Sequence, residues 1–188
     1  GRDKIELVKY DLKGNEEVIF SNQHTDIVGA LYNLEKDQIL FTVYETDKFH
    51  YEFFDSEFEK IFNHMKDKLG VDESEFGIND YNKEMTKFIV SVSSDTVYGK
   101  YYYYDSETDT MTPLAELGSW IDSNNLAKMH PISYEARDGL TIHGYLTLPK
   151  NKVAKDLPLV VLPHGGPWWR DSWGFNREVQ LLANQGYA

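Results

Sequence analysis

Short segments in which hydrophobic and polar residues alternate dominate the chain from residue 5 to about residue 114. They are rich in β-branched and aromatic residues, and polar turns separate them, which is typical of β-strands. The segments cover residues 5–10, 17–20, 27–33, 38–44, 50–54, 87–93, 100–104 and 110–114. We therefore expect an antiparallel meander in this part of the chain.

Two turns within this meander resemble each other. Residues 10–15 and residues 104–109 both begin with Tyr-Asp and are both followed by a strand-like segment. Asp, Asn and Gly supply the side-chain bonds and left-handed conformations that tight turns need. The repetition suggests propeller blades, each built from four strands in about 40 to 50 residues. The region has room for about two to three blades, fewer than the four of the smallest closed ring, so we expect an incomplete β-propeller.

A single amphipathic helix is predicted between the strands. Ser56 and Glu59 have the spacing of a capping box, and Gly70 suits the C-terminal stop. One apolar face is formed by Phe58, Ile61, Phe62, Met65 and Leu69. We expect this helix to pack on the edge of a blade, and the acidic run at residues 72–75 to be a solvated loop.

The pattern changes near residues 115–129, and we place a domain boundary between residues 117 and 118. Strict alternation over residues 140–148, after a turn at 137–139, predicts a β-hairpin whose buried face holds Leu140, Ile142, Leu146 and Leu148. Residues 157–162 form a continuous apolar run, which is typical of a strand covered on both faces of a mainly parallel sheet. Residues 176–185 read as a helix closed by Gly186.

Composition and charge narrow the range of partners and compartments. Thirty-one Asp and Glu against nineteen Lys and Arg give a net charge of −12, which repels nucleic acid and anionic lipid. The chain has no cysteine, which fits the cytoplasm and also permits the periplasm. Neither a signal peptide nor an apolar stretch long enough to span a membrane is present in the sequence. We expect a soluble protein with no nucleic-acid or membrane partner.

The chemistry is suggested by Pro163-His164-Gly165-Gly166-Pro167, which follows the apolar run and precedes the last predicted helix. A strand, a glycine loop and a helix in this order form half of the oxyanion hole in α/β-hydrolases. Glycine is required because a backbone N–H must approach the charged oxygen of a tetrahedral intermediate with no side chain in the way. The fold class expected for the chain is therefore mixed: incomplete antiparallel β-propeller blades in residues 1–117, then the N-terminal part of an α/β-hydrolase domain in residues 118–188.

Several stretches together resemble the start of the catalytic domain of the prolyl oligopeptidase family of serine peptidases, closest to its acylaminoacyl-peptidase and dipeptidyl-peptidase branches. They are residues 131–140, 144–146, 164–167 and 184–187. The resemblance implies a β-propeller that covers an α/β-hydrolase domain. It also implies roles for matching residues. Gly165 or Gly166 would donate the oxyanion hydrogen bond, His164 with Pro167 would support the loop, and Trp168 and Trp169 would lie near the substrate cleft.

The nucleophile of this chemistry is missing from the sequence. No Gly-x-Ser-x-Gly elbow occurs, and the nearest imitation, around Ser172, lacks the leading glycine. We expect the serine, acid and histidine of the triad to lie downstream of Ala188, and the 188-residue piece alone to be inactive. The histidines show no metal-ligand spacing, so we expect neither a metal nor a cofactor.

The function expected for the parent protein is hydrolysis of short peptides through an acyl-enzyme, with release of N-terminal amino acids, acylamino acids or dipeptides. Two alternatives stay open at this point: a carboxylesterase on the same fold, and a non-catalytic interaction protein built on propeller blades. The partner expected for the peptidase is a peptide substrate. Unpaired sheet edges would also allow a homo-oligomer.

Overall fold

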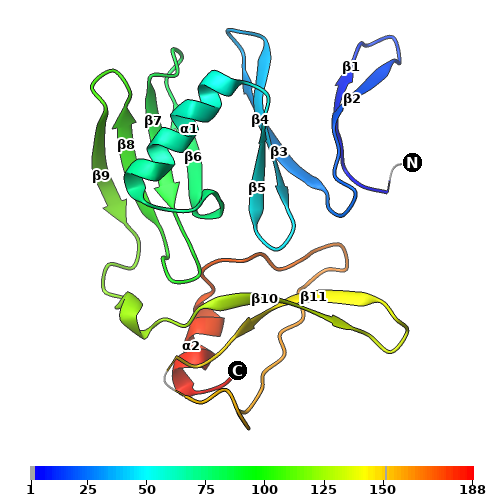
Figure 1. Cartoon of the computed structure of the whole chain (residues 1–188), viewed down its shortest axis with the longest axis vertical. Helices are drawn as coiled ribbons and strands as arrows, with labels where there is room; N and C mark the ends of the chain where they lie inside the picture. Colours follow the sequence, from blue (N-terminus) through cyan, green and yellow to red (C-terminus); the bar gives the residue numbers. More distant parts are fainter. Residues whose placement is uncertain (1–2, 151) are drawn as a thin grey trace. The chain divides into compact units, whose positions relative to one another are not determined.

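The computed structural model describes residues 3–150 and 152–188, and the chain separates into two compact units. The first unit comprises residues 1–77 with 82–85, and the second comprises residues 78–81 with 86–188. Antiparallel sheets are the main regular structure of both units (Figure 1). Within the described ranges, none of the helices combines the length and the apolar character that crossing a bilayer requires.

The first unit contains two small antiparallel sheets. Strands β1 (Leu7–Tyr10) and β2 (Glu16–Phe20) form a hairpin. Strands β3 (Ile27–Asn33), β4 (Gln38–Glu45) and β5 (Phe49–Phe53) form a three-stranded meander in sequence order. The turn between β1 and β2 is held by Asp11, whose carboxylate accepts hydrogen bonds from the backbone N–H groups of Lys13 and Asn15. These short strands are joined by short polar turns, as in propeller blades.

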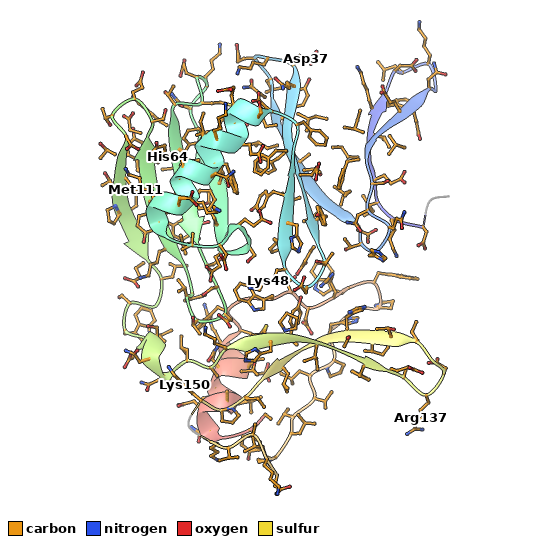
Figure 2. All side chains as sticks on the ribbon, in the orientation of Figure 1. Asp37, Lys48, His64, Met111, Arg137 and Lys150 are labelled. Atoms are coloured by element: carbon orange, nitrogen blue, oxygen red, sulfur yellow. The ribbon has the colours of Figure 1, made fainter. Side chains whose placement is uncertain are left out.

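Helix α1 (Ser56–Leu69) completes the core of the first unit (Figure 1). Its face of Phe58, Phe62 and Met65 is buried, whereas His64 projects outward and is exposed (Figure 2). The ring of Phe62 lies 4.8 Å from that of Tyr51, 5.0 Å from that of Phe53 and 4.9 Å from that of Phe76. The helix ends at Gly70, which adopts the left-handed conformation with φ of 66°.

The second unit is built on a four-stranded antiparallel sheet in strict sequence order. Its strands are β6 (Phe76–Tyr81), whose first two residues belong to the first unit, β7 (Lys87–Val92), β8 (Lys100–Asp105) and β9 (Thr110–Glu116). Strand β7 buries Phe88, Val90 and Val92 alternately, and the ring of Phe88 stacks on that of Tyr104 in β8. A four-stranded meander of this kind is the unit of a propeller blade.

After this sheet the chain forms a separate hairpin and one helix. A 3₁₀ turn at Ser123–Asn125 leads into β10 (Met129–Glu135), which pairs with β11 (Thr141–Thr147) as a two-stranded sheet with Arg137 at its tip (Figure 2). Helix α2 (Arg177–Gln185) follows a long irregular segment. Asn176 caps its N-terminus, and Gly186, with φ of 95°, ends it.

The structure confirms the eight predicted strands, the first helix, the hairpin and the last helix, with shifts of a few residues at their ends. Strand β6 was missed, because Gly77, Asn79 and Asp80 give it the composition of a turn. The predicted capping box at Ser56 is wrong: Asp55 caps α1 by accepting bonds from the N–H groups of Glu57 and Phe58. The acidic run also differs from the predicted loop, since Glu73–Glu75 forms a 3₁₀ turn.

The predicted buried face of the hairpin is also wrong. Leu140 is 62% exposed, and Ile142, Leu146 and Leu148 are only half-buried. The reason is that β10 and β11 form a sheet of two strands to which no further strand is added. Alternation therefore predicted the strands correctly but not the layer that would cover them.

Replacement of Phe62 by Ala should destabilise the first unit strongly. The side chain is completely buried among aromatic rings, so its removal leaves a cavity that costs about 3 to 5 kcal/mol. Denaturant unfolding followed by circular dichroism measures the loss. F54A is the matched control, since Phe54 is 37% exposed, and an equal loss in both variants would contradict the assignment of Phe62 to the core.

Tyr51 should make the first unit sensitive to alkaline pH. Burial, with a smaller contribution from the charge of Glu73, raises the pKa of Tyr51 from 10.0 to about 12, and its hydroxyl donates a hydrogen bond to the carbonyl oxygen of Phe76. A raised pKa means that the neutral phenol stabilises the fold; this stability is fully present below pH 10 and is lost as the pH rises toward 12.

Y51F should be about 1 kcal/mol less stable than the wild type at neutral pH, because it lacks the hydrogen bond. It should also lose less stability than the wild type between pH 10 and 12, as measured by denaturant unfolding across that window. The exposed Tyr10 gives the control Y10F, which should be as stable as the wild type at neutral pH and between pH 10 and 12. Parallel loss of stability in Y51F and the wild type would show that Tyr51 is not the titrating group.

Candidate active site

The glycine loop, residues 164–167, lies on the surface of the second unit. His164 Nδ1 lies 2.7 Å from the carbonyl oxygen of Gly165, and because a carbonyl only accepts, the ring nitrogen must carry the proton. The N–H groups of Gly165 and Gly166 donate no hydrogen bond to the backbone of any described residue. Two adjacent amide donors are therefore available to an incoming acceptor.

The two glycines differ in the space around them. A Cβ atom added at Gly165 would meet no atom within 4 Å, whereas one added at Gly166 would lie 3.2 Å from the backbone nitrogen of Trp168 and 3.7 Å from His164 Nδ1. Glycine at position 166 is thus required by the close packing of the loop on itself. At position 165 its absence of a side chain leaves the approach open.

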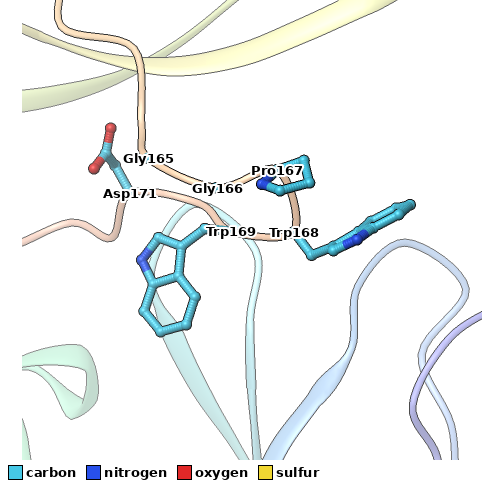
Figure 3. A pocket seen from close by; sticks show the side chains of 6 residues that line it. All are labelled: Gly165, Gly166, Pro167, Trp168, Trp169 and Asp171. Atoms are coloured by element: carbon cyan, nitrogen blue, oxygen red, sulfur yellow. The ribbon is translucent and has the colours of Figure 1, made fainter.

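A shallow depression of about 560 Å³ adjoins the loop (Figure 3). It is lined by Gly165, Gly166, Pro167, Trp168, Trp169 and Asp171. Trp168 is 92% exposed and Trp169 is 75% exposed, and their indole rings leave the loop in different directions (Figure 3). Exposed tryptophans beside free amide donors form a surface suited to a peptide, which presents both apolar side chains and carbonyl oxygens.

The predicted strand at residues 157–162 is not formed as a regular strand, and its residues are exposed except for the half-buried Leu157. The segment makes a single pair of backbone contacts instead. Val160 N–H donates to the carbonyl oxygen of Ala188 at 2.8 Å, and Ala188 N–H donates to that of Pro158 at 2.9 Å. This pattern, in which one residue bonds to both neighbours of Leu159, is that of two parallel strands. An apolar run becomes a regular strand only where a ladder of such bonds is present.

The segment that follows the loop is attached to the hairpin at two points. The indole N–H of Trp173 donates to the carbonyl oxygen of Met129 at 2.9 Å, and a guanidinium N–H of Arg170 donates to the hydroxyl of Tyr145 at 3.3 Å. Ser172 belongs to the stretch that most nearly matches a nucleophile elbow in sequence. It lies in this exposed segment and not between a strand and a helix.

Helix α2 is attached through a buried polar cluster that sequence reasoning missed. The side-chain amide of Gln180 accepts a bond from Ala127 N–H at 2.9 Å, and donates to the carbonyl oxygens of Ala127 at 2.8 Å and Asp95 at 2.9 Å. The carboxylate of Asp95 accepts a bond from Met129 N–H at 2.7 Å. We call Asp95, Ala127, Met129 and Gln180 the Gln180 cluster.

Aromatic contacts reinforce this attachment. The ring of Phe175, just before α2, lies 4.9 Å from that of Tyr98, and the guanidinium of Arg177 lies 4.7 Å above the same Tyr98 ring. Tyr98 and Asp95 both belong to the connection between β7 and β8. One signal in the sequence could have revealed the cluster: Gln180 lies three residues before Ala183, and a polar side chain on the buried face of a helix needs partners.

No group of three or more His, Asp or Glu side chains is placed to hold a metal ion in the part of the chain that the structure describes. The predicted site residues 164–169 do lie together around one depression, apart from His164, which contacts it through Gly165. Their roles in chemistry stay a prediction at this point.

Comparison with known proteins shows a sequence relative over part of the chain. The chain is 38% identical over 108 residues to the dipeptidyl aminopeptidase BIII of Pseudoxanthomonas mexicana, a match that covers 54% of this chain and 16% of that protein. No family model matches the sequence.

Solved structures extend the similarity to most of the chain. A putative dipeptidyl aminopeptidase IV from Bacteroides ovatus superposes with a TM-score of 0.55 at 16% identity, covering 93% of this chain and 25% of that structure. The AtxE2 isopeptidase with Astexin3-dC4 bound superposes with a TM-score of 0.53 at 14% identity, covering 97% of this chain and 28% of that structure. The chain thus spans about a quarter of the length of these structures, and shares their fold over that span.

Replacement of Asn176 by Ala should loosen the start of α2. Its side chain accepts bonds from the N–H groups of Glu178 and Val179, and the loss of such a cap costs about 1 kcal/mol. Amide hydrogen exchange in the first turn of α2 should become faster. N184A, on the exposed surface of the same helix, is the control. Unchanged exchange at Glu178 and Val179 in N176A would contradict the cap.

Proposed function

Because this chain is a member of the prolyl oligopeptidase family of peptidases, we propose that the protein that carries it is a serine peptidase. It hydrolyses short peptides through an acyl-enzyme and releases N-terminal amino acids, acylamino acids or dipeptides. The present stretch supplies the oxyanion loop, and the Ser, Asp and His of the triad come from elsewhere in the full-length protein. The identity of 38% to a dipeptidyl aminopeptidase favours an enzyme that acts from the amino terminus of its substrate.

The observation that carries the proposal is that the backbone amide groups of the glycine loop are not used in backbone hydrogen bonds. The amide groups of Gly165 and Gly166 are not engaged in a backbone hydrogen bond of a reverse turn, so they can donate to an oxygen that gains negative charge. His164 keeps the loop in shape by donating to the carbonyl oxygen of Gly165, which is the supporting role proposed for it. A preorganised donor of this type lowers the barrier of acyl transfer by about 3 to 4 kcal/mol.

The proposal also assigns the two domains. Residues 118–188 form the start of an α/β-hydrolase domain, and residues 1–117 belong to β-propeller blades. The parallel contact between Leu159 and Ala188, separated by α2, supports the first part, since a strand, a helix and a parallel strand are the repeating unit of an α/β sheet. The four-stranded meander β6–β9 supports the second.

The depression beside the loop would hold the substrate. Trp168 and Trp169 offer apolar area for side chains on either side of the scissile bond, while the glycine amides bind its carbonyl oxygen. A peptide ligand fits this arrangement, and the AtxE2 structure was solved with Astexin3-dC4 bound. The propeller blades would limit access to substrates of small size.

A fluorophosphonate probe tests the proposal directly. The full-length protein should be labelled covalently at a serine and should release amino acids or dipeptides from a panel of short peptides. The 188-residue piece should stay unlabelled, because it contains no Gly-x-Ser-x-Gly elbow. Absence of labelling in the full-length protein would overturn the peptidase assignment, and labelling with cleavage of esters but not of peptides would favour a carboxylesterase.

G166A tests the role of the loop in the same full-length protein. The added methyl group would lie 3.2 Å from the nitrogen of Trp168, so the loop must shift and misdirect its donors. We expect kcat to fall about a hundredfold, as on loss of one oxyanion donor. G29A, at a strand glycine with no atom within 4 Å of the added Cβ, is the matched control. An unchanged kcat in G166A would remove this loop from the mechanism.

A further inference from the structure

Gln180 is a polar residue on the buried side of α2, with only 7% of its surface exposed. Its amide group makes three hydrogen bonds, one to the N–H of Ala127, one to the carbonyl of Ala127 and one to the carbonyl of Asp95. Glutamine suits this position because one planar group both accepts and donates. Any apolar side chain of the same size would leave three buried backbone groups without these partners.

The segment that contains the glycine loop is attached beside α2 at one end and to the Gln180 cluster at the other. At the start of that segment, Pro158 and Val160 bond to Ala188, the second residue after the cap of α2. At its end, Trp173 bonds to the carbonyl oxygen of Met129, whose N–H is held by Asp95. Between these two attachments the residues of the loop are exposed, and Arg170, three residues after it, bonds to the hydroxyl of Tyr145. Its direction therefore depends on the elements that hold its ends.

We infer that Gln180 is a positioning residue for catalysis: by fixing α2 against Ala127 and Asp95, it sets the direction of the amide groups of Gly165 and Gly166. This inference rests on the proposed function and adds to it a residue outside the depression. Gln180 touches no substrate. It acts through α2 and the two attachments, and a displacement of about 1 Å in a catalytic donor is sufficient to reduce a rate about a hundredfold.

The distinction from a purely structural role is kinetic. The oxyanion hole binds charge that is present only in the transition state, so misdirected donors lower kcat and kcat/KM equally and leave KM unchanged. A structural role would reduce the number of folded molecules and would leave the rate of each folded molecule unchanged. If active sites are counted before rates are measured, the positioning role and the structural role give different results.

The experiment uses the full-length protein with Gln180→Met, a substitution that keeps the length of the side chain and removes its hydrogen bonds. Burst titration with an activated acyl substrate counts competent sites, and peptide hydrolysis then gives kcat per site and KM. We expect kcat per site to fall about tenfold or more in Q180M, with KM within about twofold of the wild type. Q185M, on the exposed surface of the same helix, should match the wild type in both values.

Gln180→Glu provides a second measurement if Q180M yields no titratable sites. An ionised carboxylate accepts the bond from Ala127 N–H but repels the carbonyl oxygens of Ala127 and Asp95, whereas a protonated one donates to one of them. The ratio of kcat per site in Q180E to that in the wild type should therefore rise as the pH is lowered.

The outcomes separate this inference from the proposed function. If the wild type neither titrates nor cleaves peptides, the proposed function fails. If the wild type is active and Q180M shows wild-type kcat per site, the positioning role of Gln180 is overturned while the function stands. The positioning role would also be overturned if the ratio of kcat per site in Q180E to that in the wild type did not change with pH. Reduced kcat per site at constant KM supports it.

Discussion

The second unit depends on hydrogen bonds that side chains make to the backbone of Ala127 and Met129. In a larger sheet such groups would pair with a neighbouring strand, but here Gln180 satisfies both polar groups of Ala127, while Asp95 and Trp173 satisfy those of Met129. Each of these groups, left buried without a partner, would cost about 1 to 3 kcal/mol. Two stretches that are distant in sequence, one around Asp95 and one at residues 173–180, are therefore joined at one short backbone segment.

This arrangement links the two kinds of architecture in the protein. Asp95 belongs to the connection within the four-stranded meander, whereas Trp173 and Gln180 belong to the stretch that carries the glycine loop and α2. The four-stranded sheet and the stretch with the glycine loop are then held together by buried polar groups, which fix direction more sharply than apolar contact does. The loop can remain exposed because the segment that carries it is fixed at both ends.

The sequence predicted those features that depend on local pattern. Alternation identified the strands, as in β7, and a glycine in the left-handed conformation ends each helix where Gly70 and Gly186 predicted it. Features that depend on distant neighbours were not predictable in this way. The apolar run at 157–162 lacks a ladder, Leu140 lacks a covering layer, and the partners of Gln180 lie 53 and 85 positions away.

The parallel contact between Leu159 and Ala188 constrains how the intervening stretch can vary in length. Trp173 and α2 fix the path back to Ala188, so one residue inserted between them would slip the pairing by one position. In a strand continued from Ala188, every side chain would then turn to the opposite face of the sheet. Residues 167–172 form an exposed excursion before Trp173, so a change in their number leaves this pairing in place, at the expense of the bond between Arg170 and Tyr145. Insertions and deletions among homologues should gather in that excursion and spare the helix.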